Sequence, residues 1–206
     1  MQNKYKKLAE KVISVMNERL AYLGKDPSYS HLEECAYALG CGFNNGATRC
    51  AFIFHEERVV FKFPFYNRTN RDYCEMELEY YESAKDYGVE KILLPIYYMG
   101  RTAEGIPIYL QPMFTKPECE LRYQEELEIE NKVNVPKPLV DKVRRNCYDR
   151  SLPRRWTGRA IQIYGKKFMR SFERWTNVCE VNDLHSGNVG YLNRQPVIID
   201  YAGYWD

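Results

Sequence analysis

The chain is most constrained by a series of short apolar runs that brief turns separate. Most of the runs are rich in β-branched and aromatic residues and are too short for buried helices, which favours strands. Three residues, 55–57, separate two of the runs, a length typical of a β-hairpin. We therefore expect five antiparallel strands in this part of the chain. The runs cover residues 35–40, 48–54, 58–65, 92–100 and 106–114.

Amphipathic segments surround and interrupt these runs. Residues 3–24 place apolar side chains three or four positions apart, and so does the segment that ends at Gly88, between the third and fourth runs. This spacing predicts helices with one buried face, so the expected class is α+β. In the second half, helical patterns cover 116–131, 138–148 and 157–175, and strand-like runs follow at 191–193 and 196–200.

The composition is that of a globular protein. A chain of 206 residues with 45% hydrophobic and 15% aromatic residues can bury a core, as one domain or as one domain built from two lobes. No run approaches the roughly 18 apolar residues of a membrane span, so no membrane partner is expected. The seven cysteines are odd in number and form no C-x-x-C pair, which favours free thiols in a reducing cytoplasm.

Positive charge is concentrated in residues 142–174. This segment carries eleven Lys or Arg against two acidic residues, although the net charge of the chain is only +2. Such a block can bind an acidic protein partner or substrate, but it is also typical of the solvated face of a helix. Trp156, Tyr164 and Phe168 could stack on bases, but their helical spacing favours the core, so nucleic acid is not an expected partner.

The segment from Val181 onwards carries the residues most suited to chemistry. Small and polar residues after Asp183 are typical of a tight loop, and Asn188 lies five positions further on. A predicted hairpin then carries Asp200 back beside this loop. Because Mg²⁺ prefers oxygen ligands and retains water and phosphate in its shell, two of these groups would suit a magnesium–phosphate complex. The remaining carboxylate would orient a hydroxyl nucleophile.

Asp183-x-x-x-x-Asn188, followed by apolar residues and Asp200-Tyr-Ala-Gly203, resembles the catalytic loop and metal-binding motif of the protein-kinase-like superfamily. The Asp-Leu-His-x-x-Asn form is closer to aminoglycoside-type phosphotransferases than to typical eukaryotic protein kinases. The resemblance implies that Asp183 is the catalytic base and that Asn188 and Asp200 hold Mg²⁺. One departure is Val181, which stands where the family has a loop histidine.

Two upstream features follow in the family's order. Gly40, Gly42 and Gly46 match a glycine-rich strand–turn–strand whose N–H groups approach phosphates, with one residue too many before the third glycine. Lys62 matches the family's strand lysine. As a lysine in an otherwise apolar run it needs an anionic partner, and the resemblance places a glutamate for this role on the following helix.

Three glutamates of that helix, Glu75, Glu77 and Glu79, compete to be the partner of Lys62. Apolar residues follow Glu77 at three, four and seven positions, which places it on the inward face of the helix. Glu77 is therefore the preferred partner, and the other two stay open.

The resemblance covers roughly residues 35–206 and implies a two-lobed fold. Residues 1–34 form an N-terminal helical extension, 35–114 a nucleotide-binding lobe and 115–206 a reduced C-terminal lobe. Because the sequence ends six residues after Asp200, we expect no activation segment and none of the later helices of a protein kinase. Gln111 and Met113 match, by position, the hinge whose backbone binds the adenine of ATP.

Two functions stay open. The catalytic positions predict a minimal phosphotransferase that uses ATP and Mg²⁺ to phosphorylate a protein or small-molecule hydroxyl and that depends on a partner, similar to small kinases of bacterial effectors and phages. The reduced substrate-binding part instead favours a pseudokinase-like binding module that docks to a partner protein. Either would act in the cytoplasm of the producing cell or of a host.

Overall fold

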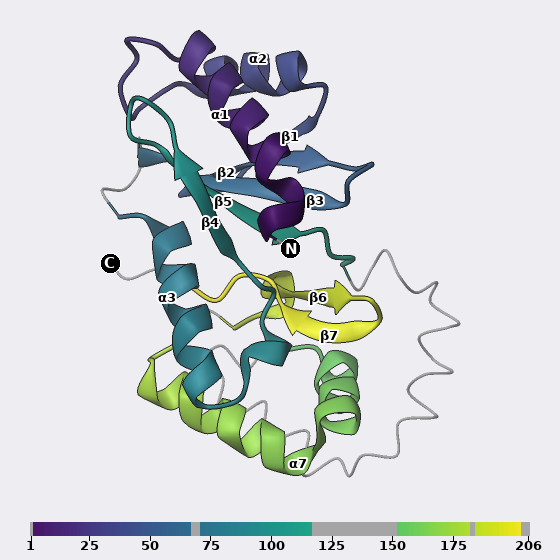
Figure 1. Cartoon of the computed structure of the whole chain (residues 1–206). Coiled ribbons are helices and arrows are strands. Elements are labelled where there is room, and N and C mark those ends of the chain that lie inside the picture. The colour runs from purple at the N-terminus through teal and green to yellow at the C-terminus, as the bar shows by residue number, and fades with distance from the viewer. Residues whose placement is uncertain (1, 67–70, 117–151, 182–183, 203–206) are drawn as a thin grey trace. The chain divides into compact units, whose positions relative to one another are not determined.

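The computed structural model describes residues 2–66, 71–116, 152–181 and 184–202. The fold is α+β, with a five-stranded antiparallel sheet as its largest element, as the sequence predicts (Figure 1). In the part of the chain that is described, no helix is both long and apolar enough to cross a membrane. The chain divides into two compact units, of which unit 1 comprises residues 1–78 and 95–113 and unit 2 comprises residues 79–94 and 114–206.

Unit 1 contains the sheet, in the strand order β1-β2-β3-β5-β4. Helix α3 begins in unit 1 and ends in unit 2. The elements of unit 1 are the 3-10 helix η1 (Gln2–Tyr5), α1 (Lys6–Arg19), α2 (Tyr29–Leu39), β1 (Gly42–Asn45), β2 (Arg49–Phe54), β3 (Val59–Pro64), α3 (Tyr73–Asp86), β4 (Tyr97–Arg101) and β5 (Pro107–Pro112).

The prediction of a strand at residues 35–40 is wrong, because this segment is the second half of helix α2. Ser28 caps the helix in a capping box with His31, in which Ser28 accepts from the His31 N–H and His31 accepts from the Ser28 N–H. Gly40 ends the helix in the left-handed region, at φ 68°. The first strand of the sheet is β1 instead, so the predicted number of strands is correct although one position is not.

Alternation along the strands gives the sheet two unlike faces. On one face Phe52, Phe61 and Leu110 are partners across β2, β3 and β5. They are fully buried in one cluster with Val12 of α1 and Leu32 of α2, so these two helices cover this face (Figure 1). The N-terminal helices therefore complete the apolar core of unit 1, and the side chains on the opposite face of the same strands are free for polar contacts.

Unit 2 combines a long helical segment with a β-hairpin. Gly165 has φ 83° and ψ 161°, so the single helix predicted for 157–175 is broken there. The indole of Trp156 donates to the Gly190 carbonyl at 3.1 Å, which fixes the hairpin to the first part of this helix. The elements are η3 (Glu90–Ile92), α7 (Arg154–Val178), η4 (Ser186–Asn188), β6 (Val189–Leu192) and β7 (Gln195–Ile198). Most of the residues predicted as helices at 116–131 and 138–148 lie outside the described residues.

Candidate functional site

A buried carboxylate, Glu77, gathers two cations on the polar face of the sheet in unit 1. The Lys62 ammonium donates to both of its oxygens, at 2.9 Å to Oε1 and 2.7 Å to Oε2. Arg49 Nη1 donates to Oε1 at 2.5 Å, and the Gln111 amide donates to Oε2 at 3.3 Å. We call these four residues the Glu77 cluster. Three strands and one helix each contribute one member.

The Glu77 cluster is almost completely removed from water. The Glu77 side chain is 0% exposed, and the side chains of Arg49 and Lys62 are 10% and 13% exposed. A carboxylate buried to this extent needs both charge compensation and hydrogen bonds, and the cluster supplies both. Arg49, Lys62 and Glu77 together carry a net charge of +1, so the single carboxylate of the cluster is shared by two cations.

The strand register explains why these side chains meet. Lys62 is the cross-strand partner of Ala51 on one side and of Tyr109 on the other. Residues two positions from a partner point to the same face, which places Arg49 on the Ala51 side and Gln111 on the Tyr109 side. Of the three competing glutamates, the structure thus brings Glu77 to Lys62, whereas Glu75 and Glu79 are exposed.

Arg49 was not anticipated as a site residue. Its signal is present in the sequence, because Arg49 opens a run in which alternate positions, Cys50, Phe52 and Phe54, are apolar and buried. Arg49 alternates with these residues and so points to the opposite face of the strand. A cation there needs a buried anion, just as Lys62 does.

The three glycines of the predicted phosphate loop have different surroundings. Gly40 is the C-cap of α2, and Gly42 lies in β1 opposite Ile53. Gly46 lies in the turn between β1 and β2, where its N–H donates to the Arg49 carbonyl at 2.8 Å. The strand–turn–strand is therefore present, but Gly40 serves the preceding helix and not the turn.

Gln111 and Met113, which were predicted to lie at the adenine, make hydrogen bonds within the sheet and its cluster. Gln111 is 2% exposed, and its amide contacts Glu77. The Met113 N–H donates to the Arg58 carbonyl at 2.8 Å and so extends the β3–β5 ladder. The Met113 N–H is therefore already used by a strand partner, and the adenine contact of this segment's backbone stays a prediction.

In unit 2, the hairpin brings two of the predicted metal ligands to neighbouring positions. Val189 of β6 is opposite Ile198 of β7, and the Asn188 carbonyl accepts from the Ile199 N–H at 2.9 Å. Asn188 thus faces the residue that precedes Asp200. Asn188 is buried and Asp200 is half-buried. Asp183, the predicted base, lies outside the described residues.

The donor set of this hairpin fits Mg²⁺. An amide oxygen and a carboxylate are ligands that Mg²⁺ accepts, and this ion takes most of its shell from water and phosphate, so it requires few protein groups. Among the described residues, no group of three or more His, Cys, Asp or Glu could hold a metal ion. His185 has its ring Nδ1 engaged, accepting from the Gly187 N–H at 3.0 Å.

A second carboxylate fixes the start of α3. Asp72 Oδ1 accepts from the N–H groups of Cys74 and Glu75, at 2.9 and 3.0 Å, and therefore caps the helix. Its Oδ2 accepts from the Tyr109 hydroxyl at 2.8 Å. Burial raises the pKa of Asp72, against the hydrogen bonds that lower it, and burial also raises the pKa of Tyr109. Both side chains line a cavity of about 430 Å³ in unit 1, together with Tyr66 and Tyr98.

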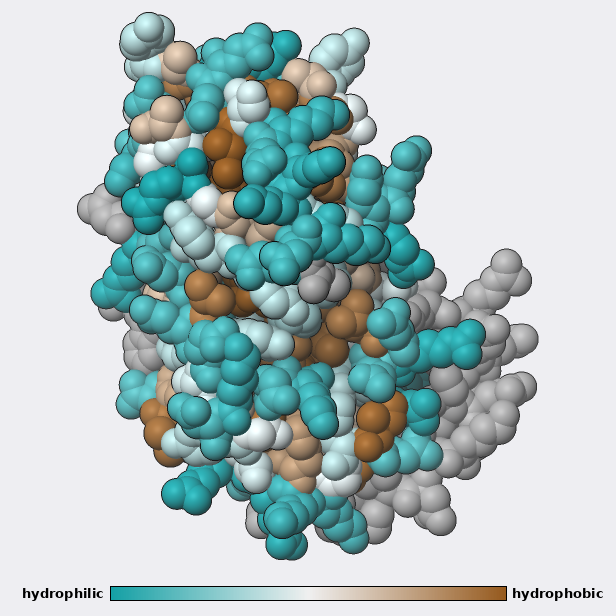
Figure 2. All heavy atoms as spheres, viewed as in Figure 1, coloured by the Kyte–Doolittle hydropathy of each residue, from teal (hydrophilic) through white to brown (hydrophobic). Residues whose placement is uncertain are grey.

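The described part of the basic block belongs to α7. The exposed basic residues there are Lys166, Lys167, Arg170 and Arg174. Figure 2 shows many hydrophilic side chains along the lower margin of the view, where Figure 1 draws α7. Residues 142–151 of the block lie outside the described residues. Trp156 is buried, and Tyr164 stacks on Phe168 at 4.8 Å between ring centroids, partly buried against the core. These aromatic residues are core and not a stacking surface.

A scan against protein-family models found no match, and searches of the curated proteins and of the solved structures found no match either.

The Glu77 cluster predicts strong coupling between its two cations. Arg49→Met and Lys62→Met should each lower the free energy of unfolding by about 1–3 kcal/mol, because the other cation still compensates Glu77. The double variant should lose about 0.5–3 kcal/mol beyond the sum, because it leaves a buried charge without either cation. Urea unfolding of the four proteins measures this coupling directly.

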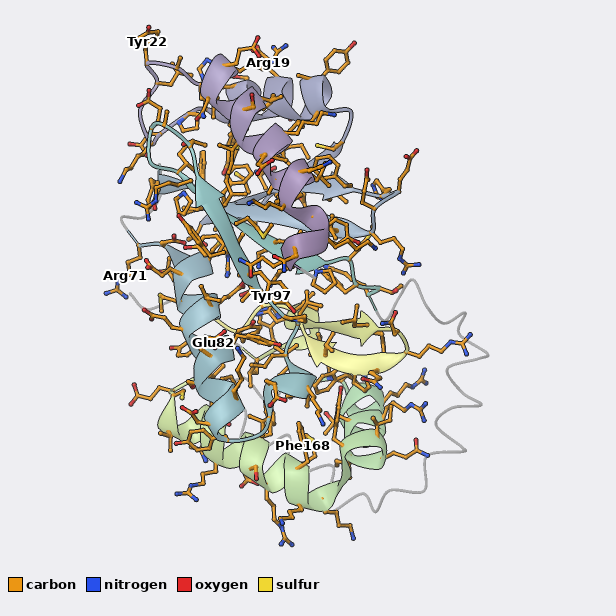
Figure 3. The ribbon with its side chains drawn as sticks, in the orientation of Figure 1. Arg19, Tyr22, Arg71, Glu82, Tyr97 and Phe168 are labelled. Atoms are coloured by element: carbon orange, nitrogen blue, oxygen red, sulfur yellow. The ribbon has the colours of Figure 1, made fainter. Side chains whose placement is uncertain are left out.

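The matched control is the exposed pair of Lys85 and Glu82 on α3 (Figure 3). Lys85→Met should change the free energy of unfolding by less than about 0.5 kcal/mol. Additive losses from Arg49→Met and Lys62→Met would show that the two cations do not share one carboxylate.

Asp72 predicts a dependence of stability on pH. Its raised pKa means that the folded state holds this proton more tightly than the unfolded chain, so the contribution of Asp72 to stability falls as pH rises through the folded pKa. Asparagine caps helices as well as aspartate and cannot ionise. The free energy of unfolding of Asp72→Asn minus that of wild type should therefore increase from about pH 4 to about pH 7. Asp86→Asn, at the exposed end of α3, is the control, and a decrease for Asp72→Asn would contradict the assignment.

Proposed function

We propose that the chain is a minimal kinase-like phosphotransferase, which transfers the γ-phosphate of ATP to a hydroxyl group of a protein or small molecule. The observation that carries the proposal is the buried contact between Lys62 of β3 and Glu77 of α3. A strand lysine held by a glutamate of the next helix is what the resemblance implies for a nucleotide site. The five-stranded sheet and the helix between its third and fourth strands support the same proposal.

Each proposed role follows from the chemistry of the side chain. Lys62 would contact the α- and β-phosphates, and Glu77 would hold it there. The oxygens of Asn188 and Asp200 would hold Mg²⁺, which neutralises charge on the transferred phosphate. Asp183 would orient the acceptor hydroxyl. Because the Met113 N–H donates to Arg58 and the Gln111 amide donates to Glu77, neither group is assigned a contact with adenine.

The same observation on Met113 favours a second candidate, a pseudokinase-like binding module that docks to a partner protein. A hinge whose backbone donor is already bonded within the sheet binds nucleotide less well. The exposed basic residues of α7 would then supply the surface for an acidic partner, by charge attraction. Nucleotide binding separates the two candidates.

Binding of ATP with magnesium is the first prediction of this proposal. At a hundredfold excess over its Kd, the nucleotide should add about 2.7 kcal/mol to the free energy of unfolding. For a domain of this size each kcal/mol raises Tm by about 2–4 °C. Asp200→Asn should abolish the magnesium-dependent part of the shift, whereas Asp86→Asn should keep it. An unchanged Tm of wild type at saturating nucleotide would refute the phosphotransferase and leave the binding module.

Phosphoryl transfer is the second prediction. Asp183→Asn should lower transfer of labelled γ-phosphate about 10²- to 10⁴-fold, because a positioned base is lost. Its affinity for ATP should stay near that of wild type, since the carboxylate faces the acceptor and not the nucleotide. Transfer is measured with added hydroxyl compounds and with cell extract, and ATP hydrolysis is measured in parallel. Equal activity of wild type and Asp183→Asn would overturn the role of Asp183.

A further inference from the structure

Arg49 has no role in the function proposed above, and its contacts are specific. It is 9% exposed, it donates to Glu77 Oε1, and its guanidinium lies 5.8 Å from the centre of the Tyr73 ring. Glu77 and Tyr73 both come from the first turns of α3. Arg49 therefore ties strand β2 to the helix that presents Glu77.

The arrangement of donors on Glu77 shows what Arg49 can do. Each carboxylate oxygen accepts from Lys62 and from one further side chain, which is Arg49 on Oε1 and Gln111 on Oε2. If the Lys62 ammonium turns away, each oxygen retains a donor. One of the two donors carries a full positive charge, so the buried carboxylate stays compensated.

A lysine that binds phosphate has to rotate its ammonium group away from the glutamate, at least in part. An ammonium group has three protons, and those that point to Glu77 cannot also point to a phosphate. Without a second cation, moving Lys62 towards a phosphate would leave a buried carboxylate weakly compensated, and this cost would reduce nucleotide affinity. With Arg49 in place, most of that cost is absent.

We infer, resting on the proposed nucleotide-binding function, that Arg49 is a positioning residue for Lys62: it holds Glu77 so that Lys62 can turn to the phosphates of the nucleotide. Arg49 acts through Glu77 and Lys62 and does not touch the nucleotide. Its effect is therefore confined to ligands that carry the phosphates that Lys62 binds, and it disappears when the charge of Glu77 is removed.

The experiment compares ATP with adenosine as probes, in calorimetric titrations well below the melting temperature of each variant. Arg49→Met should weaken ATP binding about tenfold, the loss expected for one hydrogen bond to a charged group. Adenosine binding should stay unchanged. Arg49→Lys keeps the charge and should restore part of the affinity for ATP. Arg101→Met removes the same charge from an exposed position on β4 and should leave both affinities unchanged.

The background of Glu77→Gln provides the decisive comparison, because it leaves no buried carboxylate to compensate. There, adding Arg49→Met should weaken ATP binding no further, because the charge through which Arg49 acts on Lys62 is missing. A further loss would mean that Arg49 touches the nucleotide itself, and would overturn the inference. Equal losses for ATP and adenosine, or none for either, would reduce Arg49 to a structural residue. Failure of wild type to bind either probe would instead refute the nucleotide-binding function.

Discussion

The compensation of one buried negative charge governs the polar side of unit 1. Glu77 is fully buried, and a carboxylate there is tolerable only with cations and hydrogen-bond donors around it. These donors come from β2, β3 and β5, so the carboxylate cannot be satisfied unless all three strands are paired in the observed register. A slip of one residue would turn Arg49, Lys62 or Gln111 to the aromatic face. The cluster therefore specifies the register of the sheet as well as the position of α3.

The opposite face of the sheet depends on the same register. There Phe52 and Phe61 are cross-strand partners beneath α1 and α2, and Phe52 also packs against Phe63 with ring centroids 4.9 Å apart. Aromatic packing supplies most of the driving force for burial, because it removes large apolar areas from water. The polar face selects the observed strand register, because only this register brings the donors of the Glu77 cluster together. A sheet covered by helices on one face can in this way hold an ionic cluster on the other without loss of its core.

Much of unit 1 can be predicted from the sequence, because alternating apolar residues have a clear period. The strands at 48–54 and 58–65 are observed within one or two residues of their predicted ends. The pairing of Lys62 with Glu77 was also anticipated, since the helical period favoured Glu77 over Glu75 and Glu79. By contrast, residues 35–40 were predicted as a strand from a short isolated run, although Leu32, Cys35, Ala36 and Leu39 share one face of a helix.

Other features depend on information that no local pattern contains. The break at Gly165 interrupts a segment whose aromatic residues keep helical spacing on both sides. It needs a positive φ, which glycine allows but which the presence of a glycine does not by itself predict. The contact of Arg49 with Glu77 joins residues 28 positions apart. It follows from strand register, which is set by the whole sheet. Met113 likewise was assigned by its place in a motif, and whether its N–H is used depends on how far the β3–β5 ladder extends.

The hairpin of unit 2 shows how backbone contacts fix the position of a buried polar residue, Asn188. A side chain at Gly190 would come within 3.0 Å of the Phe114 ring and of the Thr115 carbonyl, so the close pairing of Thr115 with Tyr191 requires glycine there. That pairing and the bond from Trp156 hold β6 on two sides. Asn188 immediately precedes this strand, so its position follows from the backbone contacts of the hairpin. A side chain that the fold already holds in place loses little conformational entropy when it makes a further contact.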